Sequence, residues 1–338
     1  MSRRLFLLCL VMCLLCGCSA ESAPRQTSYT ATFLDLFDTV TTVVGYAPSK
    51  QEFEAQAQQI HDQLAHYHGL FDIYHPYDEN NLYTVNQQAG NAPVTVSPVI
   101  LELLADCKDY YDLTGGRVNV AMGAVLQLWH EARTAGIQNP AQAKLPDADA
   151  LSQAVQHTDM ENLVLDMDAG TVFFRDPQMR LDVGAIAKGW AAQKVAQAAP
   201  AGMLISVGGN VCATGPKPGD TPWVIGIQNP EGGEYLHTVY VKTGAVVTSG
   251  DYQRTYWVGD QSYHHIIDPD TQMPARYWRS VTVVCEDSAL ADALSTALFL
   301  LPLEQGRALV QAAGAQAYWL DTQGQEFTTP GFDAIIRT

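Results

Sequence analysis

The sequence predicts an α+β fold in which antiparallel sheets are flanked by helices and two halves pack intimately against each other. Residues 51–198 are dominated by amphipathic helical stretches, and residues 203–285 by short runs rich in Val, Ile, Tyr and Thr. The order of these elements is not the regular βαβ alternation of a doubly wound sheet. No linker interrupts residues 29–338, so we interpret them as one compact domain.

The first half of this domain is expected to combine one strand or hairpin with several helices. Its elements are predicted from apolar periodicity, and its breaks from Gly pairs and polar turns such as Asp78–Asn81. In chain order they are a strand or hairpin over 29–46, helices over 51–69, 98–112 and 120–135, a hairpin over 162–175, and a helix over 185–198.

The second half is expected to be an antiparallel meander that ends in two helices and a strand pair. The meander strands are predicted at 203–207, 222–228, 235–241, 254–258, 262–267 and 280–285. Ser288 is expected to cap a helix through Leu300, and Pro302 to start a second helix to Ala313. A strand pair near 315–328 follows.

The N-terminus has the pattern of an export signal. A basic start precedes an apolar run over residues 5–15 that is short for a bilayer span. Leu15-Cys16-Gly17-Cys18 resembles a bacterial lipoprotein box, so we expect cleavage after residue 17, a lipid on Cys18 and a tether over 18–28. The protein would then be anchored by lipid to the plasma membrane, facing the extracytoplasmic side. The alternative is an ordinary signal peptide with an incidental cysteine.

Charge and cysteine content narrow the class of ligand. With 19 Lys and Arg against 36 Asp and Glu, the net charge is −17, which argues against nucleic acid as a partner. A phosphate-bearing ligand would need backbone N–H groups, a lysine or a metal ion to bind such an acidic chain. Beyond the signal and Cys18, the cysteines Cys107, Cys212 and Cys285 match no zinc spacing, and one disulfide among them is left open.

Residues 181–189 indicate an anion-binding helix start. An apolar lead-in with Asp182 runs into Gly184 and then a helix-forming stretch. The free N–H groups of the first turn would face an anion, and Lys188 would add a positive charge. The competing interpretation is a surface helix start whose acid interacts favourably with the helix dipole.

Residues 291–297 indicate a place for a metal ion. Asp292 and Thr296 are four apart, so on a helix they share one face and offer hard oxygen ligands of the kind that Mg²⁺ prefers. The competing interpretation is that Asp292 caps the helix or faces water, but apolar residues surround it in the sequence. A carboxylate buried among them needs a cation or hydrogen-bond donors.

The pair His264-His265 invites a zinc interpretation, which the geometry disfavours. Adjacent side chains on a strand point to opposite faces, so the two rings would not readily share one ion. The following Asp268-Pro269 is turn chemistry. No G-x-S-x-G elbow or Walker A loop is present in the sequence, which removes the main support for a serine hydrolase or a P-loop enzyme.

Taken in order, these motifs resemble the FAD:protein FMN transferase (ApbE) family over roughly residues 33–322. Several short motifs in the same order are much more specific than any one alone. The matching segments are Phe37-Asp38-Thr39, Tyr74, Leu181 to Gly189, Ser206 to Asn210, Thr248 to Tyr252, His265 to Pro269 and Ala291 to Thr296.

The resemblance implies an activity and a set of site residues. Enzymes of the family bind FAD and Mg²⁺, cleave the pyrophosphate, join FMN through a phosphoester to a threonine or serine of a partner protein, and release AMP. By this likeness Mg²⁺ would be held by the Ala185 carbonyl, Asp292 and Thr296. FAD would be contacted by Phe37, Tyr74, Asp182, Lys188 and Ile267. As a catalytic base, Asp182 would accept the proton of the acceptor hydroxyl.

One segment departs from the family pattern G-x-x-D-x-T-x-G-P. Here Gly116 to Ala124 place Asn119 at the acid and Ala121 at the threonine. Asn119 is still expected to hydrogen bond to FAD, but without charge. The departure bears on affinity for FAD, and leaves the metal site untouched.

The resemblance also implies a protein partner. Acceptors would be extracytoplasmic flavoproteins that carry a D-x-x-[ST]-G-A-[ST] motif, which this chain lacks. Its nearest match is Thr243-Gly244-Ala245, with Tyr240 in place of the acid. Two alternatives remain, an FAD pyrophosphatase in which water replaces the acceptor hydroxyl, and a non-catalytic flavin-binding lipoprotein.

Overall fold

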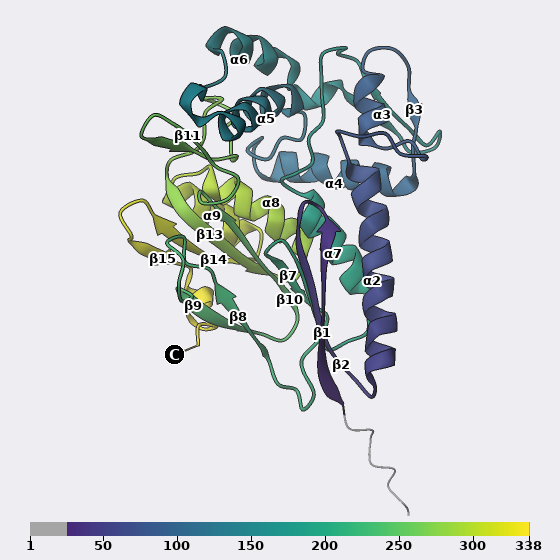
Figure 1. Cartoon of the computed structure of the whole chain (residues 1–338), viewed down its shortest axis with the longest axis vertical. Helices are drawn as coiled ribbons and strands as arrows, with labels where there is room; N and C mark the ends of the chain where they lie inside the picture. Colours follow the sequence, from purple (N-terminus) through teal and green to yellow (C-terminus); the bar gives the residue numbers. More distant parts are fainter. Residues whose placement is uncertain (1–25, 338) are drawn as a thin grey trace, which may run out of the picture.

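The computed structural model describes residues 26–337 and shows the expected α+β architecture, built on an eight-stranded antiparallel sheet (Figure 1). Its strand order is β1-β2-β6-β7-β10-β13-β14-β15. The strands are β1 (Thr27–Leu36), β2 (Thr39–Ala47), β6 (Met203–Val207), β7 (Asn210–Ala213), β10 (Gly244–Gly250), β13 (Trp278–Cys285), β14 (Gln316–Asp321) and β15 (Glu326–Thr328). The predicted signal, the lipid site Cys18 and most of the tether lie outside the described residues.

Three smaller sheets accompany the large one. The strands β3 (Val94–Thr95), β5 (Thr171–Phe174) and β4 (Leu163–Asp166) form a three-stranded sheet in this spatial order. Two hairpins stand alone, β8 (Trp223–Ile227) with β9 (His237–Val241), and β11 (Tyr256–Val258) with β12 (Gln261–Tyr263). Every strand pair is antiparallel.

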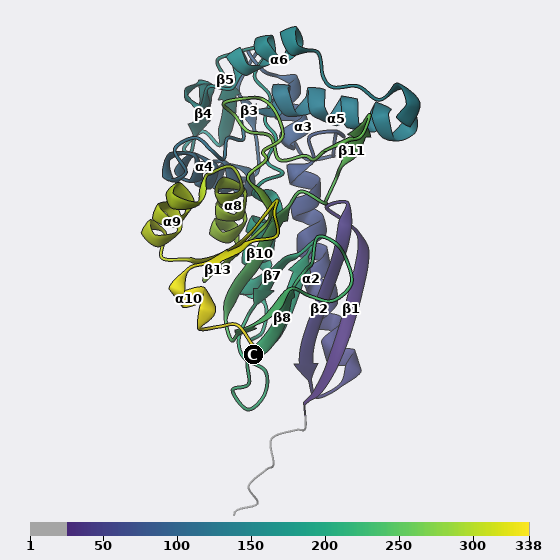
Figure 2. The same ribbon diagram turned by 90° about the vertical axis from the view of Figure 1, so that its left-hand side faces the viewer.

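Helices cover the large sheet and form a separate part above it. The helices are α2 (Lys50–Phe71), α3 (Leu82–Gln87), α4 (Pro98–Leu113), α5 (Gly123–Gln138), α6 (Ala148–Ala154), α7 (Ala187–Ala198), α8 (Ser288–Phe299), α9 (Leu303–Ala312) and α10 (Pro330–Asp333), with short 3-10 turns at Pro140–Gln142, Val155–His157 and Met160–Asn162. One face of the sheet packs against α2, α7 and α8, and the β8–β9 hairpin with α10 covers the other (Figures 1 and 2). Among these helices none has the length and apolar character of a membrane span.

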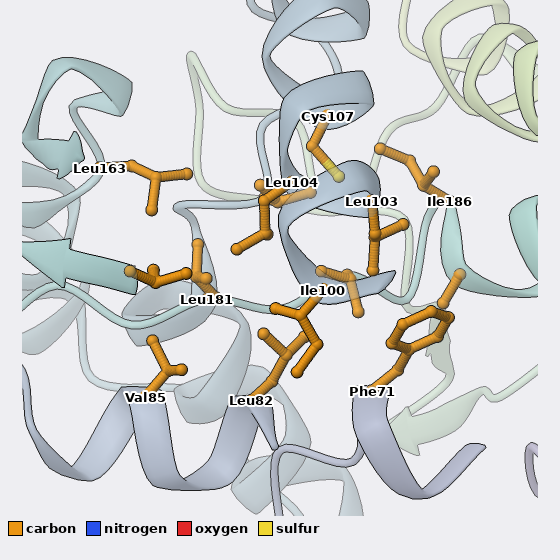
Figure 3. Close-up of a cluster of buried hydrophobic side chains, with 14 of the residues drawn as sticks. Phe71, Leu82, Val85, Ile100, Leu103, Leu104, Cys107, Leu163, Leu181 and Ile186 are labelled. Carbon is orange, nitrogen blue, oxygen red and sulfur yellow. The ribbon is translucent and has the colours of Figure 1, made fainter. Parts of the chain in front are cut away.

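The upper part is organised around α4 (Figure 3). Buried side chains of α4 such as Ile100 and Leu104 pack with residues of α3, the end of α2 and the small sheet. Leu181 and Ile186 are fully buried in the same cluster, and Val183 is 3% exposed. Because these apolar residues anchor the segment before α7, the intervening Asp182 is held at a fixed place.

The predicted hairpins and long helices are confirmed within a few residues, but the meander is wrong in two ways. It omitted β7 and β10, which lie in the centre of the large sheet, and the predicted strands at 222–241 and 254–267 belong to hairpins outside it. The strand predicted over 262–267 ends at Tyr263. The short helices α3, α6 and α10 were not predicted.

Two boundaries also differ. Asp287, not Ser288, caps α8, because its carboxylate accepts hydrogen bonds from the N–H groups of Ala289 and Leu290. Strand β1 begins at Thr27, so the last two residues of the expected tether pair with β2. All three cysteines of the domain are free thiols, two of them buried.

Candidate active site

A cavity of about 440 Å³ opens where the helical upper part meets the large sheet. Its lining includes residues of α5 and α8, the start of α7, the end of β10 and the loop before β11. The structure brings together at this cavity eight of the predicted site residues, namely Tyr74, Asn119, Asp182, Ala185, Lys188, Ile267, Asp292 and Thr296.

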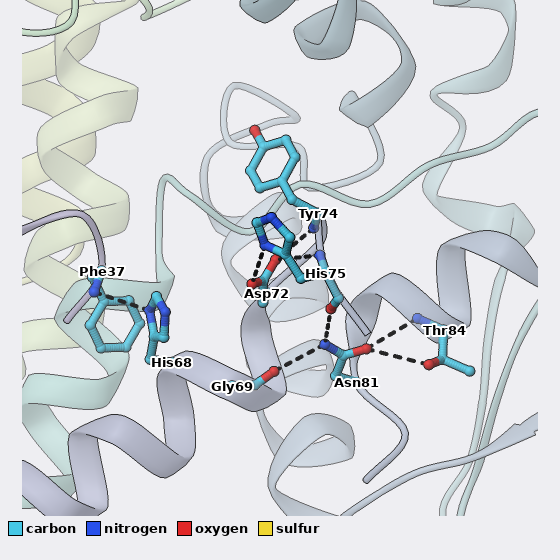
Figure 4. A network of polar contacts seen from close by, with 8 residues as sticks. All are labelled: Phe37, His68, Gly69, Asp72, Tyr74, His75, Asn81 and Thr84. Carbon is cyan, nitrogen blue, oxygen red and sulfur yellow. Dashed lines mark hydrogen bonds and ion pairs between the residues drawn. The ribbon is translucent and has the colours of Figure 1, made fainter. Parts of the chain in front are cut away.

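Phe37 is the one predicted residue that does not line the cavity. Its ring packs edge-on against His68 with 5.3 Å between centroids, and its N–H donates to Nδ1 of His68 at 3.0 Å (Figure 4). The next two residues, Asp38 and Thr39, do line the cavity. Phe37 therefore supports the turn that presents them.

Asp292 lies on α8 and is buried at the site, with only 4% of its surface exposed. Its Oδ2 accepts hydrogen bonds from the Gly189 N–H at 2.8 Å and from Nδ2 of Asn210 at 2.9 Å, and lies 4.0 Å from Nζ of Lys188. Burial raises the pKa of Asp292, and these three neighbours oppose that rise. No hydrogen bond within residues 26–337 engages Oδ1, which leaves that oxygen available to a ligand.

The Ala185 carbonyl is freed by the same hydrogen bond. In a helix that began one turn earlier, the N–H of Gly189 would donate to the carbonyl of Ala185. Because that N–H donates to Asp292 instead, no hydrogen bond in the described chain reaches the Ala185 oxygen. Ala185, Asp292 and Thr296 line one cavity, and they can offer three hard oxygen donors, a carbonyl, a carboxylate and a hydroxyl.

This donor set fits a magnesium ion that shares its ligands with a substrate. The described residues contain no group of three or more His, Cys, Asp or Glu side chains that would hold a metal without help. Mg²⁺ is commonly bound by one or two carboxylates together with substrate phosphates. A single buried carboxylate with a carbonyl and a hydroxyl meets that requirement.

Asp182 faces the cavity from the turn before α7. Its Oδ1 accepts the Gly184 N–H at 2.8 Å, and its own N–H donates to the carbonyl of Val120 at 2.8 Å. Lys188, the second residue of α7, donates from Nζ to the Gly184 carbonyl at 3.3 Å. The segment thus presents one carboxylate and one ammonium to the same cavity.

Tyr74 is held by a polar network at the end of α2 (Figure 4). The carboxylate of Asp72 accepts the backbone N–H groups of Tyr74 at 2.6 Å and His75 at 3.0 Å. The buried Asn81 ties the loop down through hydrogen bonds to the carbonyls of Gly69 and His75. The Tyr74 ring is 51% exposed and lies 5.1 Å from the ring of His130, which places it near the mouth of the cavity.

Asn119 has both ends of its amide engaged by the fold. Its Nδ2 donates to the carbonyl of Thr158 and its Oδ1 accepts the N–H of Ala121, each at 2.8 Å. An aspartate could not donate to that carbonyl. The asparagine that replaces the family's aspartate at this position therefore makes a hydrogen bond that the aspartate could not make.

The two neighbouring histidines are structural. His264 Nε2 lies 2.7 Å from the carbonyl of Ala275, and His265 Nδ1 lies 3.2 Å from the carbonyl of Gln253. Burial lowers the pKa of both, that of His265 to about 3. They line the cavity as neutral rings.

Sequence reasoning missed several residues of the cavity. Asn210 follows the turn Gly208-Gly209, whose positive φ angles of 58° and 92° are ones that glycine adopts readily. The Gly-Gly pair could therefore have indicated from the sequence that a tight turn places Asn210 at the site. The cations Arg117, Arg133 and Arg254 also line the cavity. No local sequence feature distinguishes them from surface arginines.

The chain is similar to characterised proteins over most of its length. A family model described as "ApbE family" matches residues 27–319. An FAD:protein FMN transferase of Treponema pallidum is 36% identical over 69% of this chain and 68% of its own length, and one of Klebsiella pneumoniae is 31% identical over 76% and 79%.

Solved structures have the same fold. The ApbE protein of Thermotoga maritima superposes with a TM-score of 0.82 at 29% identity, covering 92% of this chain and all of the other. The flavin transferase ApbE of Vibrio cholerae superposes with a TM-score of 0.76 at 23% identity, with 92% and 100% covered. At that identity the second likeness supports the fold alone.

Proposed function

The chain belongs to the ApbE family, and from that membership we propose how its residues carry out Mg²⁺-dependent transfer of FMN from FAD to a protein hydroxyl. One observation carries the proposal. Asp292, buried at the cavity floor and held through Oδ2 by Gly189 and Asn210, shares the cavity with Asp182 and Lys188. A binding protein would not need a buried carboxylate with one oxygen left unengaged.

In the proposed reaction, the hydroxyl oxygen of an acceptor threonine or serine attacks the phosphorus on the FMN side of the FAD pyrophosphate. The new P–O bond forms as the bond to the AMP phosphate breaks, so FAD and protein hydroxyl give protein-bound FMN, AMP and a proton. Magnesium, when bound, offsets the negative charge of the diphosphate. Ala185, Asp292 and Thr296 would hold it.

The other residues bind, orient and accept the proton. Lys188 and the N–H groups at the start of α7 would contact the phosphates. Asp182 is the proposed base, because Oδ1 is engaged by Gly184 and Oδ2 is left to take the hydroxyl proton. Tyr74, Asn119 and Ile267 would contact the rest of FAD.

The N-terminal sequence supports an extracytoplasmic location for this reaction. A lipid on Cys18 would tether the domain to the extracytoplasmic face of the plasma membrane. The acceptors would then be extracytoplasmic flavoproteins with a D-x-x-[ST]-G-A-[ST] motif. Mass spectrometry of the membrane-extracted protein tests the anchor, since an unmodified Cys18 would reject it.

The activity is tested on residues 19–338 with FAD, Mg²⁺ and a small protein that bears the acceptor motif. We expect the acceptor to gain the mass of one FMN with an equal amount of AMP. AMP and free FMN without a mass gain would favour the pyrophosphatase, and bound but intact FAD the non-catalytic binding protein.

The role of Asp182 is tested by Asp182→Asn, which should bind FAD and lose transfer. Asp168→Asn is the matched control, because Asp168 is an exposed residue of the β4–β5 turn. Full transfer activity in Asp182→Asn would reject this residue as the base.

A further inference from the structure

The turn between β1 and β2 has an unusual backbone for its sequence. Leu36 and Thr39 are paired across two turn residues, and both of these, Phe37 and Asp38, have a φ of 52°. Two-residue hairpin turns with two positive φ angles strongly prefer Asn-Gly or a similar pair. A bulky residue is strained in this conformation and keeps it only where the surrounding structure holds it. Phe37 therefore needs contacts that fix the turn.

His68, in the last turn of α2, provides two such contacts (Figure 4). The N–H of Phe37 donates to Nδ1 of His68 at 3.0 Å, and the two rings meet edge-on with 5.3 Å between centroids. For Nδ1 to accept this hydrogen bond, the ring must carry its proton on Nε2. His68 is not among the residues that line the cavity, so any effect that it has on the site passes through the turn.

The end of this turn packs against the turn between β6 and β7. A Cβ at Gly208 would lie 2.6 Å from Oγ1 and 2.7 Å from Cγ2 of Thr39. The N–H of Gly208 also donates to the carbonyl of Val40 at 3.1 Å. Thr39 and Gly208 both line the cavity. The two turns therefore form one packed unit in the cavity wall.

The turn between β6 and β7 leads directly to the buried carboxylate. Asn210 is separated from Gly208 by one residue and is only 2% exposed. Its Nδ2 donates to Oδ2 of Asp292 at 2.9 Å. A displacement of Gly208 would thus move the donor of this hydrogen bond. A continuous series of contacts connects His68 on α2 with Asp292 on α8.

We propose that His68 is a positioning residue of the metal site. It holds the β1–β2 turn, so that Thr39 stays packed against Gly208. This packing in turn keeps Asn210 in place as a donor to Asp292. Hydrogen-bond partners of a ligating carboxylate fix its orientation and are important for metal affinity. The inference rests on the proposed function where it concerns magnesium, whereas the series of contacts can be tested without it.

Three variants separate the hydrogen bond of His68 from the packing of its ring. His68→Phe keeps an aromatic ring beside Phe37 and removes the acceptor. His68→Asn keeps an acceptor, because Oδ1 of asparagine and Nδ1 of histidine are both attached to Cγ. His66→Phe is the matched control, since His66 is an exposed residue of the same helix that does not line the cavity.

The direct readout is the side-chain amide signal of Asn210 in proton–nitrogen NMR spectra of the protein without ligand. The signal is assigned as the one lost in Asn210→Ala, and Asp292→Ala shows its position when the carboxylate is absent. We expect His68→Phe to move the signal toward that position. His68→Asn and His66→Phe should leave it at the wild-type position.

Thr39→Ala is a second variant for the same readout. It removes the two atoms that would lie closest to a Cβ at Gly208, and so it weakens the contact between the two turns without touching His68. We expect it to move the Asn210 signal in the same direction as His68→Phe does.

The second readout is the magnesium requirement of AMP release from FAD in the presence of the acceptor protein. We expect His68→Phe to raise the Mg²⁺ concentration for the half-maximal rate about 2- to 10-fold, as for loss of one hydrogen bond. His68→Asn and His66→Phe should behave as wild type does. The FAD dissociation constant, measured without Mg²⁺, should change by less than about 2-fold in all three variants.

The possible results separate the proposals. An Asn210 signal that stays at the wild-type position in His68→Phe would overturn this inference, and so would equal changes in His68→Phe and His66→Phe. A loss of FAD affinity with no change at Asn210 would also overturn it, because the turn would then serve FAD. If wild type releases no AMP, the proposed function itself fails, and the NMR comparison still decides whether His68 positions Asn210.

Discussion

At Gly189 the helix α7 approaches α8 too closely to leave room for a side chain, and replacement of Gly189 by alanine should disrupt the proposed metal site. A Cβ at this position would lie 2.4 Å from Cβ of Asp292 and 2.4 Å from the carbonyl oxygen of Ser288. Ordinary contacts begin at 3.4 Å, so the helices must separate by about 1 Å. That shift would stretch the hydrogen bond from the Gly189 N–H to Asp292, now 2.8 Å long.

Two costs follow from that shift. Overpacking a well-packed contact costs about 1–3 kcal/mol. Loss of a hydrogen bond to a buried charged group costs about 1.5–3 kcal/mol. Since the two share one displacement, we expect Gly189→Ala to lower the free energy of unfolding by about 2–5 kcal/mol. The protein should stay folded at 25 °C, because domains are typically stable by about 5–15 kcal/mol.

The assay is urea unfolding followed by circular dichroism, together with Mg²⁺-dependent AMP release from FAD by folded protein in the presence of the acceptor protein. Gly306→Ala on α9 is the matched control, because the nearest atom to its Cβ would be Leu298 Cδ2 at 3.4 Å. A helical alanine there should stabilise by about 0.5–1 kcal/mol. If Gly189→Ala is as stable and active as Gly306→Ala, the close approach of α7 and α8 at Asp292 is refuted.

Three further predictions concern the same cavity. Asn119→Asp should lower the free energy of unfolding by about 1–3 kcal/mol, because the Thr158 carbonyl would lose its donor and face an anion; an unchanged urea midpoint would contradict this. EDTA should abolish AMP release and excess Mg²⁺ should restore it in wild type but not in Asp292→Asn. Burial keeps His265 neutral in the folded state, with a pKa of about 3, whereas the unfolded chain binds a proton below about pH 6.5. Stability should therefore fall as pH drops from 6.5 to 5, and His265→Gln should reduce that fall, as read from urea midpoints.

Elements with a regular apolar pattern or a clear turn were predictable from the sequence, and the strands β7 and β10 were not. The 22 residues of α2 carry an apolar face at helical spacing, and the β4–β5 hairpin has a turn with Gly170 at φ 70°. In contrast, β7 has four residues and β10 begins at a glycine, so neither has enough alternation to identify a strand. Both are strands because of their neighbours in the sheet.

The site residues also fall into those that the sequence indicates and those that only the folded structure brings together. The spacing of Asp292 and Thr296 on one helix is a local property, so the sequence alone indicated it. The hydrogen bond from Asn210 to Asp292 joins residues 82 apart, and Arg133 and Arg254 line one cavity only because of how α5 meets the loop before β11. Such contacts arise only from tertiary packing, and no single-sequence pattern contains them.

The burial of Asp292 explains why three distant segments converge at one point. Burying a carboxylate without hydrogen-bond donors would be very costly, and the fold supplies donors from the Gly189 N–H in the first turn of α7, from Asn210 at the start of β7 and from Lys188. The two hydrogen bonds engage only Oδ2, and Lys188 is also nearest to that oxygen. Burial still raises the pKa of Asp292, so these donors do not fully compensate the charge. A cation at the remaining oxygen would complete that compensation, which makes the same residue a structural tie and the proposed metal ligand.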